Sequence, residues 1–339
     1  MSTILTMGEM LLRLKPVDHQ RILQANTFEA NYGGAEANVA VSLAQLGDDA
    51  AVLTKVPANL LGQKALNTLR EFGVETSRVL QGGPRLGIYF FEKGASIRST
   101  NVVYDRAGSA FALAEASEFD WPTILAGVDY FYFSGITPAL SPALAAALDE
   151  ALAYCHAHAI KVCLDANYRG KLWTPEQAQP VIARYMPFVD ILLANDEDFE
   201  AALGIKAFDG DMSTGIDQLP SFKTAMAQLA AKYPNLHTIA SVVRNIHSVE
   251  QHDCTALMWQ AGQFYQGPIY HMHVFEGVAS GDAFGAGLLH ALKHGFAPQA
   301  QIDYADTASA LKLTISGDLN LVSDADIRGA MANAGGVNR

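Results

Sequence analysis

The sequence predicts an α/β protein with a doubly wound, mostly parallel sheet flanked by helices, and with a small β-sheet lid. Short hydrophobic strands alternate with helices along most of the chain, which is typical of parallel strands joined by helical crossovers. Two aromatic segments, 86–92 and 100–104, interrupt this alternation and favour an antiparallel insertion. Half of the 339 residues are hydrophobic, which suffices for one large core or two modest ones.

The first part of the chain follows this rhythm. The pattern predicts a strand at 4–7, edge strands within 10–28, a glycine turn and helix within 31–47, a strand at 50–55 and a helix at 60–72. Gly47 and Gly73 stand where the two helices should end, because glycine readily takes the backbone conformation that closes a helix. These elements form a βαβ start to the fold.

The insertion is expected to pair with the edge strands at 10–28 and to form the lid. We therefore assign residues 1–9, 33–85 and 107–339 to the core, and residues 10–32 and 86–106 to the lid. Exposed strand edges favour pairing with another chain, so the sequence also predicts a homodimer through the lid.

After residue 129 the alternation resumes and continues to the C-terminal region. The expected strands lie at 130–133, 161–164, 191–193 and 238–243, with a terminal hairpin at 254–259 and 263–266. The expected helices lie at 142–157, 175–185, from about 196, at 218–232, 281–294, 302–316 and 324–331.

Charge and cysteine content narrow the class of protein. A formal net charge of −12 disfavours a nucleic-acid or anionic-membrane partner, so any anionic substrate has to be bound by locally placed arginines or helix N-termini. Cys155, Cys163 and Cys254 are odd in number and lack metal-type spacing, which indicates buried thiols in a reducing cytoplasm. No stretch predicts a signal peptide or a membrane span.

Small residues dominate the stretch 275–287, which predicts a loop that runs into a helix. Gly277, Ala279 and Gly281 let backbone N–H groups approach a ligand, and the positive end of a helix starting near Gly281 would favour an anion there. Asp282 beside such a site could take a proton from an attacking hydroxyl, as phosphoryl transfer requires. The alternative is structural, since small residues allow close packing and Asp is a favoured N-cap.

Further polar residues follow predicted strands and should line one rim of the sheet. Gly8, the segment 165–169 and the segment 195–198 each follow a predicted strand, as does the stretch 275–287, which we call the anion loop. Ligands of such folds bind beyond the carboxyl ends of the parallel strands, so these segments should lie around one site. Asn38, beside a double glycine, is either a surface residue or a ligand for a hydroxylated molecule. Arg106 is either an ordinary exposed residue or a carboxylate clamp.

Two histidine pairs have spacings that a metal could use. His290 and His294 are four residues apart on a predicted helix, and His271 and His273 alternate on a strand. Because no third ligand is evident in the sequence, surface imidazoles are the favoured interpretation.

Several motifs in the right order resemble the PfkB, or ribokinase-like, family of carbohydrate kinases. The segment 33–40 resembles the N-terminal glycine signature, 195–198 the Asn-x-x-Glu segment and 281–284 the C-terminal signature. The segments 104–110, 165–173 and 317–323 resemble most the 2-keto-3-deoxygluconate kinases of that family. The resemblance spans nearly the whole chain.

The resemblance implies an ATP- and Mg²⁺-dependent kinase that converts 2-keto-3-deoxygluconate to its 6-phosphate. Asp282 would be the general base, and the backbone amides of Ala279, Ser280, Gly281 and Asp282 would form the anion hole. The implied substrate-binding residues are Gly33, Gly34, Asn38, Tyr89, Tyr104, Arg106, Arg169 and Asp282. The implied ATP-binding residues are Asn195, Arg244, Gly277, Ala279 and Gly281, and Asn195 and Asp198 would organise Mg²⁺ through water.

The chain also departs from the family pattern. Glu276 replaces the usual Asp, Ala279-Ser280 replaces Gly-Ala, and Asp198 replaces Glu. Side chains at 279 and 280 restrict positive φ, which predicts a differently shaped loop or weaker nucleotide binding. Two alternatives therefore stay open: another kinase of the family, such as a fructokinase or ribokinase, and a catalytically silent sugar-acid sensor.

Overall fold

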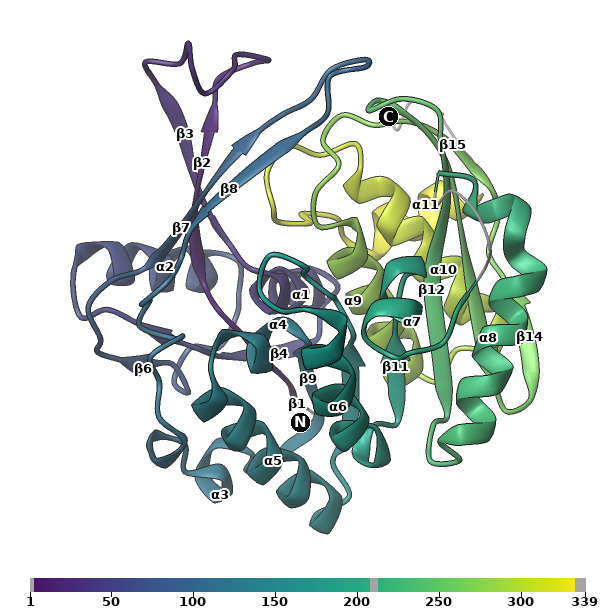
Figure 1. Cartoon of the computed structure of the whole chain (residues 1–339), viewed down its shortest axis with the longest axis horizontal. Coiled ribbons are helices and arrows are strands. Elements are labelled where there is room, and N and C mark those ends of the chain that lie inside the picture. Colours follow the sequence, from purple (N-terminus) through teal and green to yellow (C-terminus); the bar gives the residue numbers. More distant parts are fainter. Residues whose placement is uncertain (1–2, 208–212, 333–339) are drawn as a thin grey trace.

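The computed structural model describes residues 3–207 and 213–332, which form a large α/β core and a smaller β-sheet (Figure 1). The core strands are β1 (Thr3–Met7), β4 (Asp49–Leu53), β9 (Val128–Ser134), β10 (Lys161–Asp165), β11 (Ile191–Leu193), β12 (Thr238–Ile246), β13 (Gln251–Gln260), β14 (Gln263–Gln266) and β15 (Tyr270–His273). Their order is β14-β13-β12-β11-β10-β9-β1-β4, with β15 beside β13. All pairs from β4 to β12 are parallel, and the pairs of β13 are antiparallel. The predicted fold class is confirmed.

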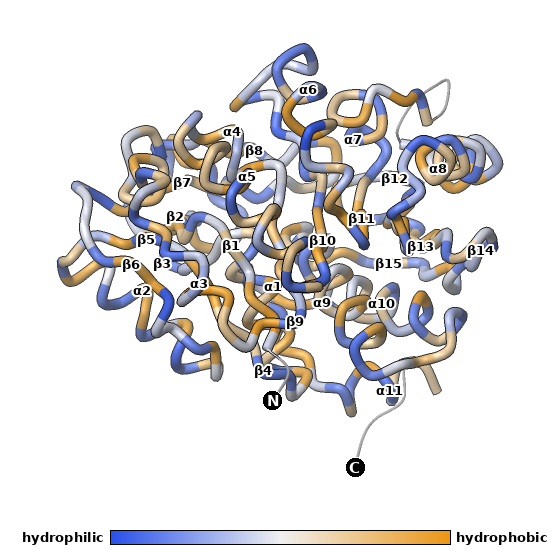
Figure 2. Tube along the Cα trace, turned by 90° about the horizontal axis from the view of Figure 1, so that it is seen from below, coloured by the Kyte–Doolittle hydropathy of each residue, from blue (hydrophilic) through white to orange (hydrophobic). Residues whose placement is uncertain are grey.

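Helices cover both faces of this sheet. One face carries α1 (Ala35–Gln45), α2 (Leu60–Glu71), α9 (Ser280–Lys293), α10 (Pro298–Lys312) and, outside α10, α11 (Asp324–Ala332). The other carries α3 (Trp121–Ile124), α4 (Ile136–Leu140), α5 (Pro142–Ala157), α6 (Pro175–Tyr185), α7 (Asp196–Ala201) and α8 (Leu219–Lys232). Neighbouring strand residues alternate between two cores, since Ile4 belongs to one and Leu5 to the other. Figure 2 shows hydrophobic residues concentrated along the central strands and the helix sides that face them.

The best-predicted helices carry explicit start signals. Ser141 accepts a hydrogen bond from Leu144 N at 3.2 Å and Pro142 follows it, so α5 begins as predicted. Thr174 and Gln177 form a capping box at the start of α6, whose predicted bounds are also confirmed.

Helix α10 was predicted at 302–316, and that prediction is wrong by about one turn. The helix begins at Pro298, which suits a first helical position because its missing N–H would have no helical partner. The chain leaves the helix after Lys312, whose ammonium donates to Ile315 O at 3.1 Å and Gly317 O at 2.9 Å. The buried lysine thus stabilises a separate turn where a last helical turn was expected.

The lid segments come together in one sheet. Its strands are β2 (Leu11–Pro16), β3 (Phe28–Gly33), β7 (Gly87–Glu92) and β8 (Asn101–Asp105), in the order β3-β2-β7-β8. Each hairpin is antiparallel, and the two hairpins meet through the parallel pair β2 and β7. In Figure 1 this sheet rises from one side of the core. A short parallel pair, β5 (Lys55–Val56) and β6 (Leu80–Gln81), lies beneath it.

Across residues 3–207 and 213–332, every helix is too short or too polar to cross a lipid bilayer.

Asp306 of α10 is a fully buried carboxyl group, and neither of its oxygens has a hydrogen-bond partner in the described part of the chain. A Cβ on Gly267 would lie 2.6 Å from Asp306 Oδ2, so glycine is required for this close approach. Burial, together with the nearby charge of Asp303, raises the pKa of Asp306 to about 8.

Asp306→Asn should therefore stabilise the protein increasingly as the pH rises. The raised pKa means that the folded state binds the proton more tightly than the unfolded chain, so wild-type stability is lost as pH rises from about 4 to about 8. Urea unfolding at pH 5 and pH 8 measures the gain, with the exposed Asp129→Asn as a control expected to stay within about 0.5 kcal/mol. The same gain at both pH values would contradict the explanation.

Candidate active site

A cavity of about 620 Å³ lies between the lid and the carboxyl ends of β10, β11 and β12. Every site residue predicted from the sequence lines it, with the exception of Gly33. These lining residues are Gly34, Asn38, Tyr89, Tyr104, Arg106, Arg169, Asn195, Asp198, Arg244, Gly277, Ala279, Ser280, Gly281 and Asp282. Gly33 lies behind the cavity, where a Cβ would come within 2.7 Å of Asp318 Cβ.

The anion loop delivers the start of α9 to this cavity. The helix begins at Ser280, so the N–H groups of Ser280, Gly281 and Asp282 belong to its first turn and have no carbonyl partner within the helix. A Cβ on Gly281 would meet no atom within 4 Å, which shows open space beside the backbone. The first turn of α9 therefore presents donors and a positive dipole end to a ligand.

Ala279 caps this helix in the left-handed conformation, with φ 60° and ψ 15°. A side chain at that position was expected to resist positive φ, yet the loop takes this conformation with alanine in place. The conformation costs about 1 kcal/mol relative to glycine. The structure thus keeps the loop bent at the expense of some strain.

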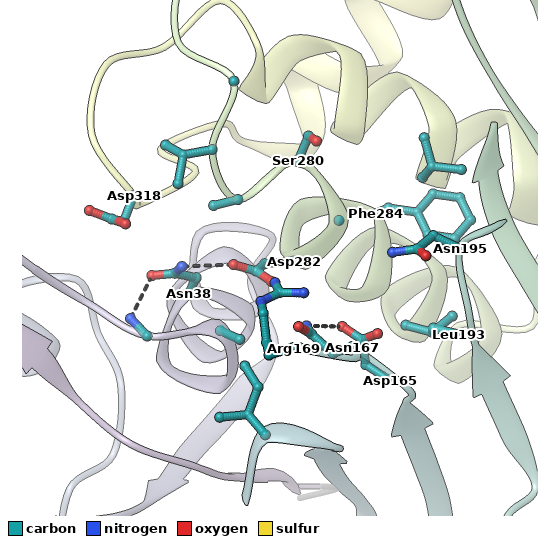
Figure 3. A pocket seen from close by; sticks show the side chains of 18 of the residues that line it. Asn38, Asp165, Asn167, Arg169, Leu193, Asn195, Ser280, Asp282, Phe284 and Asp318 are labelled. Carbon is teal, nitrogen blue, oxygen red and sulfur yellow. Dashed lines mark hydrogen bonds between the residues drawn. The ribbon is translucent and has the colours of Figure 1, made fainter. Parts of the chain in front are cut away.

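Asp282 projects from the first turn of α9 toward the N-terminus of α1 (Figure 3). Its Oδ2 accepts a hydrogen bond of 2.7 Å from Asn38 Nδ2, and Asn38 Oδ1 accepts one of 3.3 Å from Gly34 N. Asn38 is buried, so the surface interpretation of this residue is wrong. The asparagine orients the carboxylate against the glycine turn.

The surroundings of Asp282 shift its pKa toward neutral pH. Burial raises its pKa to about 7, with the hydrogen bond from Asn38 opposing the shift and the charges of Asp165 and Glu36 adding to it. Arg169 lowers the pKa to a smaller extent. A carboxyl group that titrates near neutral pH is suited to general base catalysis.

Three more buried carboxyl groups line the cavity with Asp282. The sequence placed Asp165 and Asp198 at this rim, but it did not predict Glu36 there. Glu36 accepts a 2.5 Å hydrogen bond from Ser134 Oγ, and burial raises its pKa to about 7. A Cβ on Gly8 would lie 2.0 Å from Glu36 Oε2, so Gly8 makes room for this side chain. Burial also raises the pKa of Asp165, which accepts from Asn167 Nδ2 at 2.8 Å (Figure 3).

Asp198, the third group, is held by the backbone. Its Oδ1 accepts from Tyr168 N at 2.6 Å and its Oδ2 from Asn195 N at 2.8 Å, while Asn195 caps α7 by accepting from Asp198 N at 3.0 Å. Burial, followed by the charge of Asp165, raises the pKa of Asp198 to about 7. The cavity floor therefore carries more acidic groups than nearby cations neutralise.

The arginines differ in how they are held. Arg106 is buried and forms an ion pair with Glu9, with Nε 2.8 Å from Oε2. Arg244 Nη2 donates to Ser280 Oγ at 2.9 Å and so reaches the anion loop. Arg169 is exposed at the cavity, where its Nη1 donates to Tyr168 O at 2.9 Å. The partnership of Arg106 with Glu9 was not predicted, although Glu9 follows β1 at the rim.

The lid is fastened to the anion loop by buried ion pairs. Arg13 Nη2 of β2 lies 2.6 Å from Glu276 Oε1, and Arg13 Nε lies 3.1 Å from Asp318 Oδ2. Lys15 Nζ lies 3.0 Å from Glu276 Oε2, and the hydroxyl of Tyr89 in β7 donates to Asp318. Burial alone would raise the pKa of Glu276, but the charges of Arg13 and Lys15 hold it below its ordinary value.

A doubly wound core in which a helix N-terminus at a cavity carries a buried carboxyl group in its first turn suits phosphoryl transfer to a small molecule. Residues 1–325 match the sequence profile of the pfkB family carbohydrate kinases. The chain belongs to this family and is a sugar kinase; such kinases use ATP as the phosphoryl donor.

Similar proteins cover nearly the whole chain. The crystal structure of 2-dehydro-3-deoxygluconokinase from Thermotoga maritima is 40% identical, covers 98% of this chain and 100% of its own, and superposes with a TM-score of 0.94. A 2-dehydro-3-deoxygalactonokinase from Haloferax volcanii is 33% identical over 96% of this chain and 95% of its own. Fructokinase with bound ATP from Xylella fastidiosa shares the fold at 18% identity, with 97% and 98% coverage and a TM-score of 0.75.

Glu276→Gln should destabilise the protein by about 3 kcal/mol, because it removes the charge that compensates a buried arginine. Turnover should also fall by about tenfold or more, since the anion loop loses its anchor. Urea unfolding and an ADP-release assay measure the two effects. Glu29→Gln is the matched control, because Glu29 also pairs with Lys15 but is exposed. Equal effects of the two substitutions would refute the anchoring role.

Proposed function

We propose that the protein phosphorylates the terminal hydroxyl of 2-keto-3-deoxygluconate, also called 2-dehydro-3-deoxygluconate, to give 2-keto-3-deoxy-6-phosphogluconate. The observation that carries the proposal is the position of Asp282, a buried carboxyl of pKa about 7 in the first turn of α9. The carboxylate accepts the hydroxyl proton, the freed oxygen attacks the γ-phosphorus of ATP, and ADP leaves. The amides of the first turn stabilise the charge on the transferred group.

The substrate carboxylate is the feature that separates this sugar acid from neutral sugars. Arg169 is the stronger candidate for its partner, because it reaches the cavity without a carboxylate ion pair among the described residues. Arg106 is already paired with Glu9 and stacks under Tyr104, 5.5 Å from the ring centre. Arg106 therefore shapes the lid side of the pocket, where Tyr89 and Tyr104 contact the sugar acid.

The acidic cavity floor fits Mg²⁺, which prefers oxygen ligands and retained waters. Both carboxylate oxygens of Asp198 accept backbone hydrogen bonds, so this residue and Asn195 would hold the ion through water. When bound, Mg²⁺ would neutralise charge on the phosphates of ATP. Arg244 and the backbone at Gly277, Ala279 and Gly281 bind the phosphate groups from the opposite side.

Two alternatives to 2-keto-3-deoxygluconate as the substrate are its galactonate epimer and a neutral sugar. The Haloferax volcanii relative is named for the galactonate epimer, which carries the same carboxylate and differs at one hydroxyl. A fructokinase or ribokinase activity would not need Arg169.

The lid, residues 10–32 and 86–106, is proposed to exclude water during the reaction and to pair two chains. Leu23, Ile97 and Val103 are hydrophobic and exposed on it, which supports a lid-to-lid homodimer. The buried, unpaired thiols of Cys155, Cys163 and Cys254 support a reducing cytoplasm as the compartment.

Asp282→Asn should lower kcat by about a thousandfold, because the general base is lost while the pocket keeps its shape. In the wild type, kcat should rise with pH and level off above about 7 as Asp282 ionises. A coupled ADP-release assay between pH 5.5 and 9 measures both effects.

The Asp282→Asn variant should also have a higher urea midpoint of unfolding than the wild type at pH 8, because it carries no buried negative charge. A variant that keeps a tenth of the wild-type rate would exclude Asp282 as the base.

Arg169→Gln should raise KM for 2-keto-3-deoxygluconate by about tenfold or more, because a hydrogen bond to a charged group contributes about 1.5–3 kcal/mol. The assay panel contains this acid, its galactonate epimer, fructose and ribose, and Arg184→Gln, which is remote and exposed, is the control. Turnover confined to the keto acids supports the proposal. Turnover of neutral sugars that is insensitive to Arg169→Gln would assign the chain to another kinase of the family.

A further inference from the structure

A second cluster of potential ligands lies at the opposite end of α9 from Asp282. His290 and His294, on the last turn of the helix, face Asp48, which lies between α1 and β4. His290 Nδ1 is 2.8 Å from Asp48 Oδ2, and His294 Nε2 is 3.0 Å from Asp48 Oδ1. At 1.5 Å of rise per residue, the eight residues from Asp282 to His290 separate the two sites by about 12 Å along the helix.

Surface imidazoles were expected here, and for His290 that expectation is wrong. His290 and Asp48 are only 5% and 8% exposed, whereas the His294 side chain is about half exposed. The third ligand missing from the sequence pattern is Asp48, 242 residues from His290 and brought close by the packing of α1 against α9. One atom from each of these three residues lies within 4.8 Å of the other two.

We propose that Asp48, His290 and His294 bind a divalent transition metal ion of the zinc type. Two imidazole nitrogens and a carboxylate oxygen are a common protein ligand set for Zn²⁺, with water in the fourth position. Ligand bonds of about 2.0–2.1 Å in a tetrahedron place neighbouring ligand atoms about 3.3 Å apart. The two histidines face different oxygens of Asp48, and with one ligand atom taken from each of the three residues these atoms lie within 4.8 Å of one another, so the side chains need to close in by at most about 1.5 Å.

The surroundings of the cluster support a cation. Asp324 Oδ1 lies 3.8 Å from His290 Nε2 and accepts a 2.9 Å hydrogen bond from the hydroxyl of Tyr304. Arg328 Nε also donates to both oxygens of Asp324, at 3.0 and 2.8 Å, so this carboxylate lies near the second nitrogen of His290 without a hydrogen bond to it. A small shift would make it the carboxylate partner that metal-bound histidines commonly have. The carbonyl end of α9 also carries negative partial charge.

Lys293 is the competitor of the metal. Its Nζ lies 3.0 Å from Asp48 Oδ1, the oxygen that also faces His294. Asp48 is therefore contacted by His290, His294 and Lys293 together. A bound ion must displace the ammonium, and Lys293→Ala should therefore tighten binding.

The test is a titration of the purified full chain with ZnCl₂, and with CoCl₂ as a spectroscopic probe. Because the acidic active site can bind metal as well, the readout is the difference between wild type and His294→Ala, which should lose one equivalent of zinc and the visible band of four-coordinate Co²⁺. His237→Ala is the control, since His237 is exposed and its Nε2 lies 3.9 Å from the single carboxylate of Asp190. This variant should bind as wild type does.

Two more variants sharpen the outcome. Asp324→Asn should weaken zinc binding by about tenfold, the usual effect of removing a partner behind a ligand, and Lys293→Ala should strengthen it. ADP release with Mg-ATP should be unchanged in His294→Ala, so this proposal stands or fails independently of the sugar-acid assignment. Equal zinc stoichiometry and affinity in wild type and His294→Ala would overturn it, as would a wild type that binds no zinc.

Discussion

The buried pair of Arg13 and Glu276 is the interaction on which the geometry of the site depends. It joins a lid strand to the residue just before the anion loop, and both side chains are fully buried. Such a pair costs desolvation and holds only when its remaining groups are satisfied. Lys15 and Asp318 supply the further charges, while Arg13 Nη1 has no hydrogen-bond partner among the described residues. Lys312 fixes the turn that carries Asp318. Lid, anion loop and C-terminal turn are thus constrained as one unit.

The buried carboxyl groups of the active site, unlike those around Arg13, are not each paired with a cation. The paired charges hold the fold together, whereas the unpaired ones lower its stability. Around Arg13 each buried carboxylate faces a cation, whereas Glu36, Asp198 and Asp282 all have pKa values raised to about 7 by burial and by the charge of Asp165. Ionising them costs folding free energy. The proposed role of Asp282 as general base gives this cost a benefit, because a base of ordinary pKa would be a weaker proton acceptor.

The sequence predicted those parts of the fold and site that depend on neighbouring residues, such as helix caps and glycine turns. The capped helices α5 and α6 and the strand β11 have the predicted bounds, and glycine turns placed α1 and α9 at the cavity. Pairings across long separations carry no such signal. Asn38 and Asp282 are 244 residues apart, and the burial of His290 depends on Asp48 in a distant loop. Helix and strand patterns give the direction of a side chain, while its partner follows only from the packing of elements.

The departures from the family signature now argue for a working kinase instead of a silent sensor. Loss of function would leave residues without a task at these positions. Ala279 instead takes a left-handed conformation with φ 60°, and the hydroxyl of Ser280 receives a hydrogen bond from Arg244 at the start of α9. Glu276 reaches two lid cations at once, with one oxygen on Arg13 and the other on Lys15. A silent sensor would gain nothing from these features. The strained backbone at Ala279 and the buried ion pairs of Glu276 cost folding free energy, and that cost has a benefit only if the loop still binds phosphate.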